Sequence, residues 1–202
     1  VYLDTDERRR FAQVSHEYLI EQLQFTGDES TTASSSKNAT LNFNHPVKEL
    51  VWVCRSTEHG TQDTDETNFG NSWFNWAGTT DGGANAEAFT NAKLQLNGHD
   101  RFTERNADYF RKVQCFEHHT RVGRIGDEVE TDDHREQNIH VYSFALSPEE
   151  HQPSGTCNFS RIDNAILKLN GQSTQTFGAT GEGSAMTATV LKVYAVNYNV
   201  LR

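Results

Sequence analysis

The chain has 202 residues and a mass of 22.8 kDa, which is enough for one domain with a hydrophobic core but not for two ordinary domains. Its formal net charge of -10 argues against a phosphate-binding surface, because such surfaces hold nucleic acid with clustered Lys and Arg. We therefore expect no direct contact with nucleic acid. No apolar run in the sequence approaches the ~20 residues that a membrane-spanning helix requires, so no membrane span is predicted.

The two ends of the sequence and its cysteines suggest its context. It starts at Val1 and stops at Arg202 without a Gly, a Pro or a polar tail, so we expect it to be part of a longer protein. The three cysteines, Cys54, Cys115 and Cys157, are widely spaced and form no CxxC pair. This pattern predicts neither a disulfide framework nor a zinc ribbon, and it fits a reducing cytoplasm. Cys54 lies in an apolar run and is expected to be buried.

The first predicted element is a helix over residues 4–19. Asp4 can cap its N-terminus, with Glu7 three residues later completing a capping box. Three apolar side chains then fall on one face of the helix: Phe11, Val14 and Tyr18. We interpret this segment as a connecting helix.

After this helix the apolar period changes from 3.6 to 2, which indicates short β-strands bounded by turn residues. Eight strands are predicted, over residues 18–26, 39–44, 47–55, 91–97, 100–103, 139–147, 161–169 and 186–200. The run from Leu50 to Cys54 is apolar throughout, so its strand should be central and covered on both faces. A second helix is expected around 106–116, where Phe110, Val113 and Phe116 could share a face.

The dipeptide Asn97-Gly98 separates the fourth and fifth predicted strands. Two-residue hairpin turns need positive φ and favour this dipeptide, so these two strands should be neighbours in one sheet. Eight short strands, little helix and long polar loops predict an all-β sandwich, and eight is the strand number of the jelly roll.

Several long stretches resemble the major capsid protein of nucleocytoplasmic large DNA viruses, the group that includes phycodnaviruses and iridoviruses. They are Leu3 to Ala12, Leu41 to Val53, Tyr109 to Arg121, Val141 to Arg161 and Val193 to Arg202. The resemblance is weakest in the segments 27–38, 56–88 and 122–137.

The resemblance implies an eight-stranded jelly-roll β-sandwich that is the second of two tandem jelly rolls. Residues 1–19 would be the inter-domain linker helix, and residues 20–202 the C-terminal jelly-roll domain. The full protein is then expected to form homotrimeric, pseudo-hexagonal capsomers of an icosahedral shell. Its partners would be neighbouring capsomers and minor capsid proteins. It would be made and assembled in the host cell cytoplasm and would reside in the virion.

The sequence also contains one cluster of possible metal ligands. It consists of Glu117-His118-His119 together with Asp127, Glu128, Asp132, Asp133 and His134. Adjacent histidines diverge by ~100° on a helix and point to opposite faces on a strand, so one of the pair at most could join a site. We favour ordinary hydrogen-bonded histidines and predict no metal or cofactor.

No enzymatic activity is predicted either. The sequence has no GxSxG elbow that would activate a serine nucleophile. Ser154-Gly155 follows Pro153, a pattern typical of a turn in which the Gly adopts positive φ.

A glycan-binding β-sandwich module is the alternative function, because Trp73-Phe74-Asn75-Trp76 lies in a long loop and aromatic rings can stack on sugars. We favour a structural role for these aromatic residues, as anchors against the barrel or against a neighbouring subunit.

Two acceptor patterns for N-glycosylation are present, at Asn38 and Asn158. Asn38 lies in a variable loop and is the possible glycosylation site, whereas Asn158 is expected to be structural.

The order of the strands also predicts where the long loops lie. If successive strands run in opposite directions, the loops at about 27–38, 56–90, 104–138 and 170–185 gather at one end of the barrel. These loops carry an excess of acidic residues, so this end should be the exposed outer tip. The acidic residues expected there are Asp63, Asp65, Glu66, Asp127, Glu128, Asp132 and Asp133. The segment 148–160 should lie at the opposite, inner end.

Overall fold

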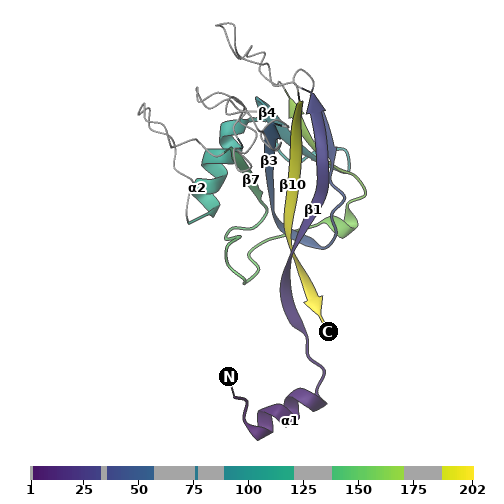
Figure 1. Ribbon diagram of the computed structural model, residues 1–202, viewed down its shortest axis with the longest axis vertical. Helices are drawn as coiled ribbons and strands as arrows, with labels where there is room; N and C mark the ends of the chain where they lie inside the picture. The colour runs from purple at the N-terminus through teal and green to yellow at the C-terminus, as the bar shows by residue number, and fades with distance from the viewer. Residues whose placement is uncertain (1, 33–35, 57–75, 77–88, 121–137, 171–187) are drawn as a thin grey trace, which may run out of the picture.

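The computed structural model describes residues 2–32, 36–56, 76, 89–120, 138–170 and 188–202. These residues form two antiparallel β-sheets packed face to face, with a short helical segment at one side. A two-stranded ribbon extends below the sandwich and leads to an isolated N-terminal helix (Figure 1). The predicted all-β sandwich is therefore confirmed.

The first sheet has the strand order β1-β10-β3-β7. Its strands are β1 (Tyr18–Thr32), β10 (Ala188–Leu201), β3 (Pro46–Ser56) and β7 (Ile139–Ser143). The short strand β8 (Cys157–Asn158) pairs with the beginning of β3. The first and last strands of the chain thus lie side by side, paired from Tyr18 opposite Leu201 to Thr32 opposite Ala188.

The second sheet has the order β2-β9-β4-β5. Its strands are β2 (Lys37–Thr40), β9 (Ala165–Asn170), β4 (Asn91–Leu96) and β5 (His99–Asp100), and β6 (Arg105–Asn106) pairs with β4. The chain therefore crosses repeatedly between the two sheets, as in a double-sheet jelly roll. The described residues contain ten strands where eight were expected, because β6 and β8 are additional two-residue pairings.

The inner faces of the two sheets form one hydrophobic core. Trp52 and Leu191 come from the first sheet and Leu94 and Leu167 from the second, and each is at most 1% exposed. Alternate residues of a strand point to opposite faces, which explains why Leu94, Leu167 and Leu191 are buried while their neighbours are partly exposed. Fully burying one side chain of this size stabilises the fold by about 1.5–3 kcal/mol.

Strand β3 lies between β10 and β7 and is buried on both faces, as predicted for its apolar run. Trp52 and Val53 point to opposite faces of the sheet, yet their exposed fractions are 0% and 6%. Cys54 is also buried, as expected.

The turn at Asn97-Gly98 has the predicted conformation, with φ of 50° and 82° at the two residues. It joins β4 to β5, which pair in antiparallel fashion as expected. The Asn97 side chain also accepts hydrogen bonds from the backbone N–H groups of Asp163 and Asn164, at 3.0 and 3.1 Å. The turn therefore also fixes the entry into β9.

The N-terminal helix α1 spans Thr5–Gln13 and is shorter than the predicted 4–19. The capping box between Asp4 and Glu7 is present. Val14 at the C-terminal cap is already extended, and Tyr18 pairs with Leu201 in the sheet. The sheet pairing therefore overrides the helical pattern at the end of the predicted segment, and α1 itself has no buried residue.

The helix expected around 106–116 is a π-helix, η2 (Tyr109–Val113), that runs directly into α2 (Gln114–His118). Phe110 is fully buried, but Val113 and Phe116 are 41% and 79% exposed. The prediction that these three side chains share a face was therefore wrong. The wider π turn changes the angular spacing of the side chains, and Gln114 takes the buried position instead.

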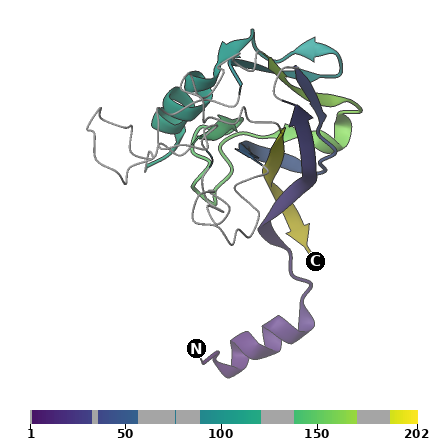
Figure 2. The same ribbon diagram turned by 45° about the horizontal axis from the view of Figure 1, so that its top comes forward.

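Other strand boundaries differ because local hydrogen bonds turn the chain. The strand predicted over 139–147 ends at Ser143, since the N–H groups of Phe144 and Ala145 both donate to the Lys48 carbonyl oxygen. The strand predicted over 161–169 begins only at Ala165, after the 3-10 helix η3 (Phe159–Arg161). Figure 2 shows η2 and α2 on the side of the sandwich away from β1.

We expect Gly155→Ala to destabilise the protein more than Gly98→Ala does. Both glycines have positive φ, 149° and 82°, so both substitutions introduce backbone strain of about 1–3 kcal/mol. A Cβ at Gly155 would also lie 2.6 Å from the Phe144 carbonyl oxygen, whereas a Cβ at Gly98 meets nothing within 4 Å. Urea unfolding of both variants measures the difference, and equal losses would show that the close approach at Gly155 is relaxed without cost.

Candidate functional site

The strand ends that flank the long loops lie together at one end of the sandwich. In the first sheet, Thr32 pairs with Ala188 and Ser56 with Thr189. In the second sheet, Lys37 pairs with Leu169, and Asn91 with Asn170. The segment between Ser56 and Asn91, which begins and ends there, contains Asp63, Asp65 and Glu66, whereas the segment that contains Asp127, Glu128, Asp132 and Asp133 begins after Thr120, whose hydroxyl is hydrogen-bonded to Glu149 of the loop over residues 144–155. All of these acidic residues lie outside the described part of the chain.

The aromatic residues of the glycan-binding alternative also fall mostly outside the described residues. Only Trp76 of the stretch from Trp73 is described, and it is partly buried. Asn38 lies in β2 with an exposed side chain. Asn158 has a structural contact, since its side chain accepts a hydrogen bond from Ser160 N–H at 3.1 Å.

A loop of residues 144–155, here called the 144–155 loop, lies away from these strand ends. Its two arms are joined by Ser147 N–H, which donates to Ser154 Oγ at 2.9 Å. Gly155 has φ of 149°, as expected for the turn after Pro153. The Ser154 hydroxyl is therefore part of the loop's own hydrogen bonding, and the positive φ predicted for Gly155 is confirmed.

The two adjacent histidines of the candidate metal cluster both contact this loop. His118 Nδ1 lies 3.0 Å from the Leu146 carbonyl oxygen. His119 lies between two carboxylates, with Nε2 at 3.1 Å from Glu49 Oε2 and Nδ1 at 3.2 Å from Glu149 Oε1. In the part of the chain that is described, no three His, Cys, Asp or Glu side chains are grouped to hold a metal ion. The other members of the candidate metal cluster, from Asp127 to His134, are not among the described residues.

The electrostatics around His119 follow from this arrangement. The Glu49 carboxylate, 3.1 Å from Nε2, raises the pKa of His119 against the opposing effect of burial, and Glu149 raises it further. Hydrogen bonds from the Thr120 hydroxyl and backbone N–H lower the pKa of the Glu149 carboxyl. The sequence pattern drew attention to the histidines, but it did not identify Glu49 of β3, which lies 69 and 70 positions before them in the chain.

A buried lysine on the same strand was missed by the sequence analysis. Lys48 is 2% exposed, and its Nζ lies 2.7 Å from Glu21 Oε1 and 5.3 Å from the centre of the Tyr198 ring. His151 of the 144–155 loop also faces Glu21, with Nδ1 at 3.4 Å. The only signal in the sequence was a lysine within a strongly apolar strand.

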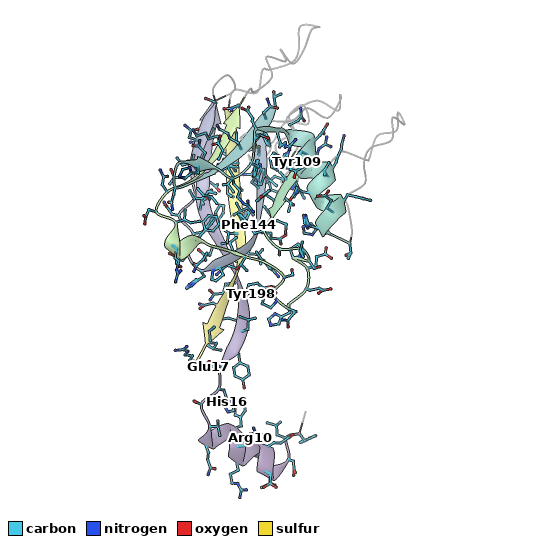
Figure 3. The ribbon with its side chains drawn as sticks, turned by 180° about the vertical axis from the view of Figure 1, so that it is seen from behind. Arg10, His16, Glu17, Tyr109, Phe144 and Tyr198 are labelled. Atoms are coloured by element: carbon cyan, nitrogen blue, oxygen red, sulfur yellow. The ribbon has the colours of Figure 1, made fainter. Side chains whose placement is uncertain are left out.

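The main candidate for a binding surface is the apolar lower part of the molecule. The lower ends of β1 and β10 form a ribbon outside the sandwich, and α1 lies beyond it, where Figure 3 labels Arg10, His16 and Glu17. We define the ribbon surface as Tyr18, Leu19, Leu23, Val200 and Leu201, which are 39% to 66% exposed. A two-stranded ribbon is at best marginally stable in water, so this surface needs a partner.

Comparisons with known proteins identify the family. Residues 7–202 match the family described as "Large eukaryotic DNA virus major capsid protein". The chain belongs to this family. It is 50% identical to the major capsid protein of Pyramimonas orientalis virus, and 42% identical to that of Paramecium bursaria Chlorella virus 1. Each alignment covers 100% of this chain but only 44% and 50% of the relative, so the chain spans about half the length of the curated relatives it matches.

The solved structures of viral capsid proteins agree with the fold. The crystal structure of PBCV-1 VP54 fitted into a reconstruction of the virophage Sputnik has a TM-score of 0.70 and 38% identity, covering 99% of this chain and 52% of that one. The Faustovirus major capsid protein has a TM-score of 0.68 at 11% identity, covering 99% of this chain and 36% of that one. The jelly-roll fold predicted from the sequence is thereby confirmed. Separately, no helix among the described residues is long and apolar enough to cross a membrane.

Lys48→Met should lower the free energy of unfolding more than Lys93→Met. Lys48 is buried, and its loss leaves Glu21 without its cation, so we expect a cost of about 1–3 kcal/mol. Lys93 forms a more exposed pair with Asp100, at 3.1 Å, for which the expected cost is about 0–1 kcal/mol. Chemical denaturation of the two variants tests this, and an equal effect would mean that the Lys48 pair contributes no more than a surface pair.

Proposed function

We propose that this chain is the C-terminal jelly-roll half of a major capsid protein that builds the shell of a large DNA virus. The observation that carries the proposal is the family match over residues 7–202, together with the jelly-roll fold. Its role is structural, and we propose no catalytic activity for it. It would reside in the virion shell after assembly in the host cell cytoplasm.

The domain organisation proposed is a linker helix over 1–19 followed by the jelly-roll domain over 20–202. Three observations support it. The chain spans about half of its relatives, α1 has no buried residue, and α1 lies beyond the ribbon, away from the sandwich. We propose that a second, upstream jelly roll of the full-length protein covers the ribbon surface.

The proposed assembly is a homotrimer in which six similar domains give a six-sided outline. Each domain of such a ring needs two lateral contacts, and the described residues offer apolar side chains on two separate faces. One is the ribbon surface. The other comprises exposed residues of η2, α2 and the 144–155 loop, namely Val113, Phe116 and Leu146, which are 41%, 79% and 75% exposed. We assign this second face to the neighbouring subunit of the trimer.

The orientation proposed for the domain places the strand ends around Thr32, Ser56 and Ala188 at the outer tip of the capsomer. Asp63, Asp65 and Glu66 in the segment that follows Ser56 support this choice, because charged polar loops are suited to solvent. The 144–155 loop then faces the shell interior, where minor capsid proteins would lie. The formal charge of -10 fits the expectation that the domain does not bind nucleic acid directly.

Phe116→Asp in the full-length protein should weaken trimer formation by about tenfold or more. A charge placed in an apolar contact must be desolvated when the subunits associate, so only the assembled state is penalised. Size-exclusion chromatography with light scattering measures the trimer fraction against concentration. Thr103→Asp, at another exposed position, is the matched control and should leave the trimer intact. A full-length protein that stays monomeric at high concentration would contradict the proposed assembly itself.

Limited proteolysis of intact particles should cut within 56–90 or 122–138 before it cuts within 148–160. The first two segments belong to the proposed outer tip, while the 144–155 loop is proposed to face inward and is held by its own hydrogen bonds. Mass spectrometry of the first fragments identifies the order of cleavage. Early cleavage within 148–160 would reverse the proposed orientation.

A further inference from the structure

The base of the 144–155 loop is fixed by contacts that do not depend on pH. Phe144 and Ala145 donate their N–H groups to the Lys48 carbonyl oxygen, at 2.9 and 3.2 Å. Ser147 and Ser154 are joined by a hydrogen bond, and Gly155 approaches the backbone of Phe144 closely. The two arms of the loop therefore stay together whatever happens at its tip.

The tip of the loop is held by ionisable groups. Glu149 accepts hydrogen bonds from Thr120 Oγ1 at 2.6 Å and from Thr120 N–H at 3.2 Å, and it faces His119 at 3.2 Å. His119 also faces Glu49 of β3 at 3.1 Å, and this contact lies in a poorly exposed position, with side chains 19% and 11% exposed. His119 thus joins three parts of the fold: the loop, the end of α2 and strand β3.

The geometry selects one protonation state of the His119 ring. A neutral imidazole has one N–H donor, so one of its nitrogens would direct a lone pair at a carboxylate. The imidazolium ion can donate from Nδ1 to Glu149 and at the same time place positive charge at Nε2, which lies 3.1 Å from Glu49 Oε2 as an ion pair. The charged ring is therefore the form that both carboxylates favour.

Among the described residues, the charged groups that shift the pKa of His119 are carboxylates. Glu117 and His118 precede it on α2, with a Glu117 carboxylate oxygen 4.0 Å from His118 Nε2, and His118 Nδ1 is directed to the Leu146 carbonyl oxygen. Burial, and to a smaller extent the charge of Glu49, raise the pKa of the Cys115 thiol, which therefore stays neutral near neutral pH. The charged groups that face His119 in the described residues are thus the carboxylates of Glu49 and Glu149.

We propose that His119 is a protonation-controlled clasp that ties the 144–155 loop to α2 and β3 while its ring is charged and releases the tip of the loop when the ring loses its proton. The proposal concerns the folded domain itself and does not depend on its role in a shell.

The pH range of the clasp follows from the two shifted groups. The folded-state pKa of His119 lies above its ordinary value of 6.5, so the stability it adds is fully present below that value and is lost as pH rises through the raised pKa. The pKa of Glu149 lies below its ordinary value of 4.5, so its contribution is lost only as pH falls through that lowered value. The clasp is therefore closed at pH values between the lowered pKa of Glu149 and the raised pKa of His119.

Hydrogen exchange of the full-length protein tests the proposal, with peptides covering the loop followed from about pH 6 to about pH 9 and corrected for the intrinsic exchange rate. In the unmodified protein we expect protection of the loop tip to fall by about tenfold for each unit by which folding raises the His119 pKa. In His119→Gln, which is neutral at every pH, protection should be low and should show no such fall. His151→Gln is the control, because His151 also faces a carboxylate but is 64% exposed, and it should keep the fall.

A second variant keeps the test independent of whether His119→Gln folds. Glu149→Gln removes one of the two carboxylates, so the His119 pKa should drop and the fall in protection should move to lower pH. Titration of the His119 ring followed by NMR reads this shift directly. Loop protection that is the same at both ends of the pH range, or a fall that persists in His119→Gln, would overturn the proposal.

Discussion

The burial of Trp52 between the two sheets is the constraint on which the rest of the structure depends. Its ring lies 5.1 Å from Phe110 and is stacked on His140 at 5.8 Å, so it joins β3 to the helical segment and to β7. Val193 of β10 is its register partner on the other side. A side chain of this size fills the space between two sheets packed about 10 Å apart, which fixes how the helical segment can approach them.

Polar contacts outside this core fix the parts of the domain that the core does not reach. The Asn97 side chain fixes the entry into β9, and Gln114 accepts the Ser143 N–H at 3.1 Å where β7 ends. Two ion pairs involve the strand that carries Trp52. Lys48 of this strand pairs with Glu21 of β1, and Glu49 pairs with His119 at the end of α2. Strand β3 is thus both the centre of the hydrophobic core and the point from which the 144–155 loop is held.

The order of the strands in the two sheets determines which surfaces the domain can offer in the proposed shell. Because the chain crosses repeatedly between the sheets, the strand ends around Thr32, Ser56 and Ala188 meet at one end, while the 144–155 loop lies away from them. The sides of the sandwich are left with the apolar surfaces that a ring of domains would bury. One domain can therefore present a polar tip to solvent and apolar sides to its neighbours.

The sequence by itself determined the local features whose physics is local: the Asp4 and Glu7 capping box, the Asn97-Gly98 turn, the positive φ of Gly155 and the burial of the Leu50 to Cys54 strand on both faces. The family followed from long motifs such as Val141 to Arg161. The features that depend on partners far apart in the chain were decided only by the tertiary structure. Leu201 draws Tyr18 into a strand instead of a helix, a π turn exposes Phe116, and Glu49 meets His119 because folding brings β3 to the end of α2.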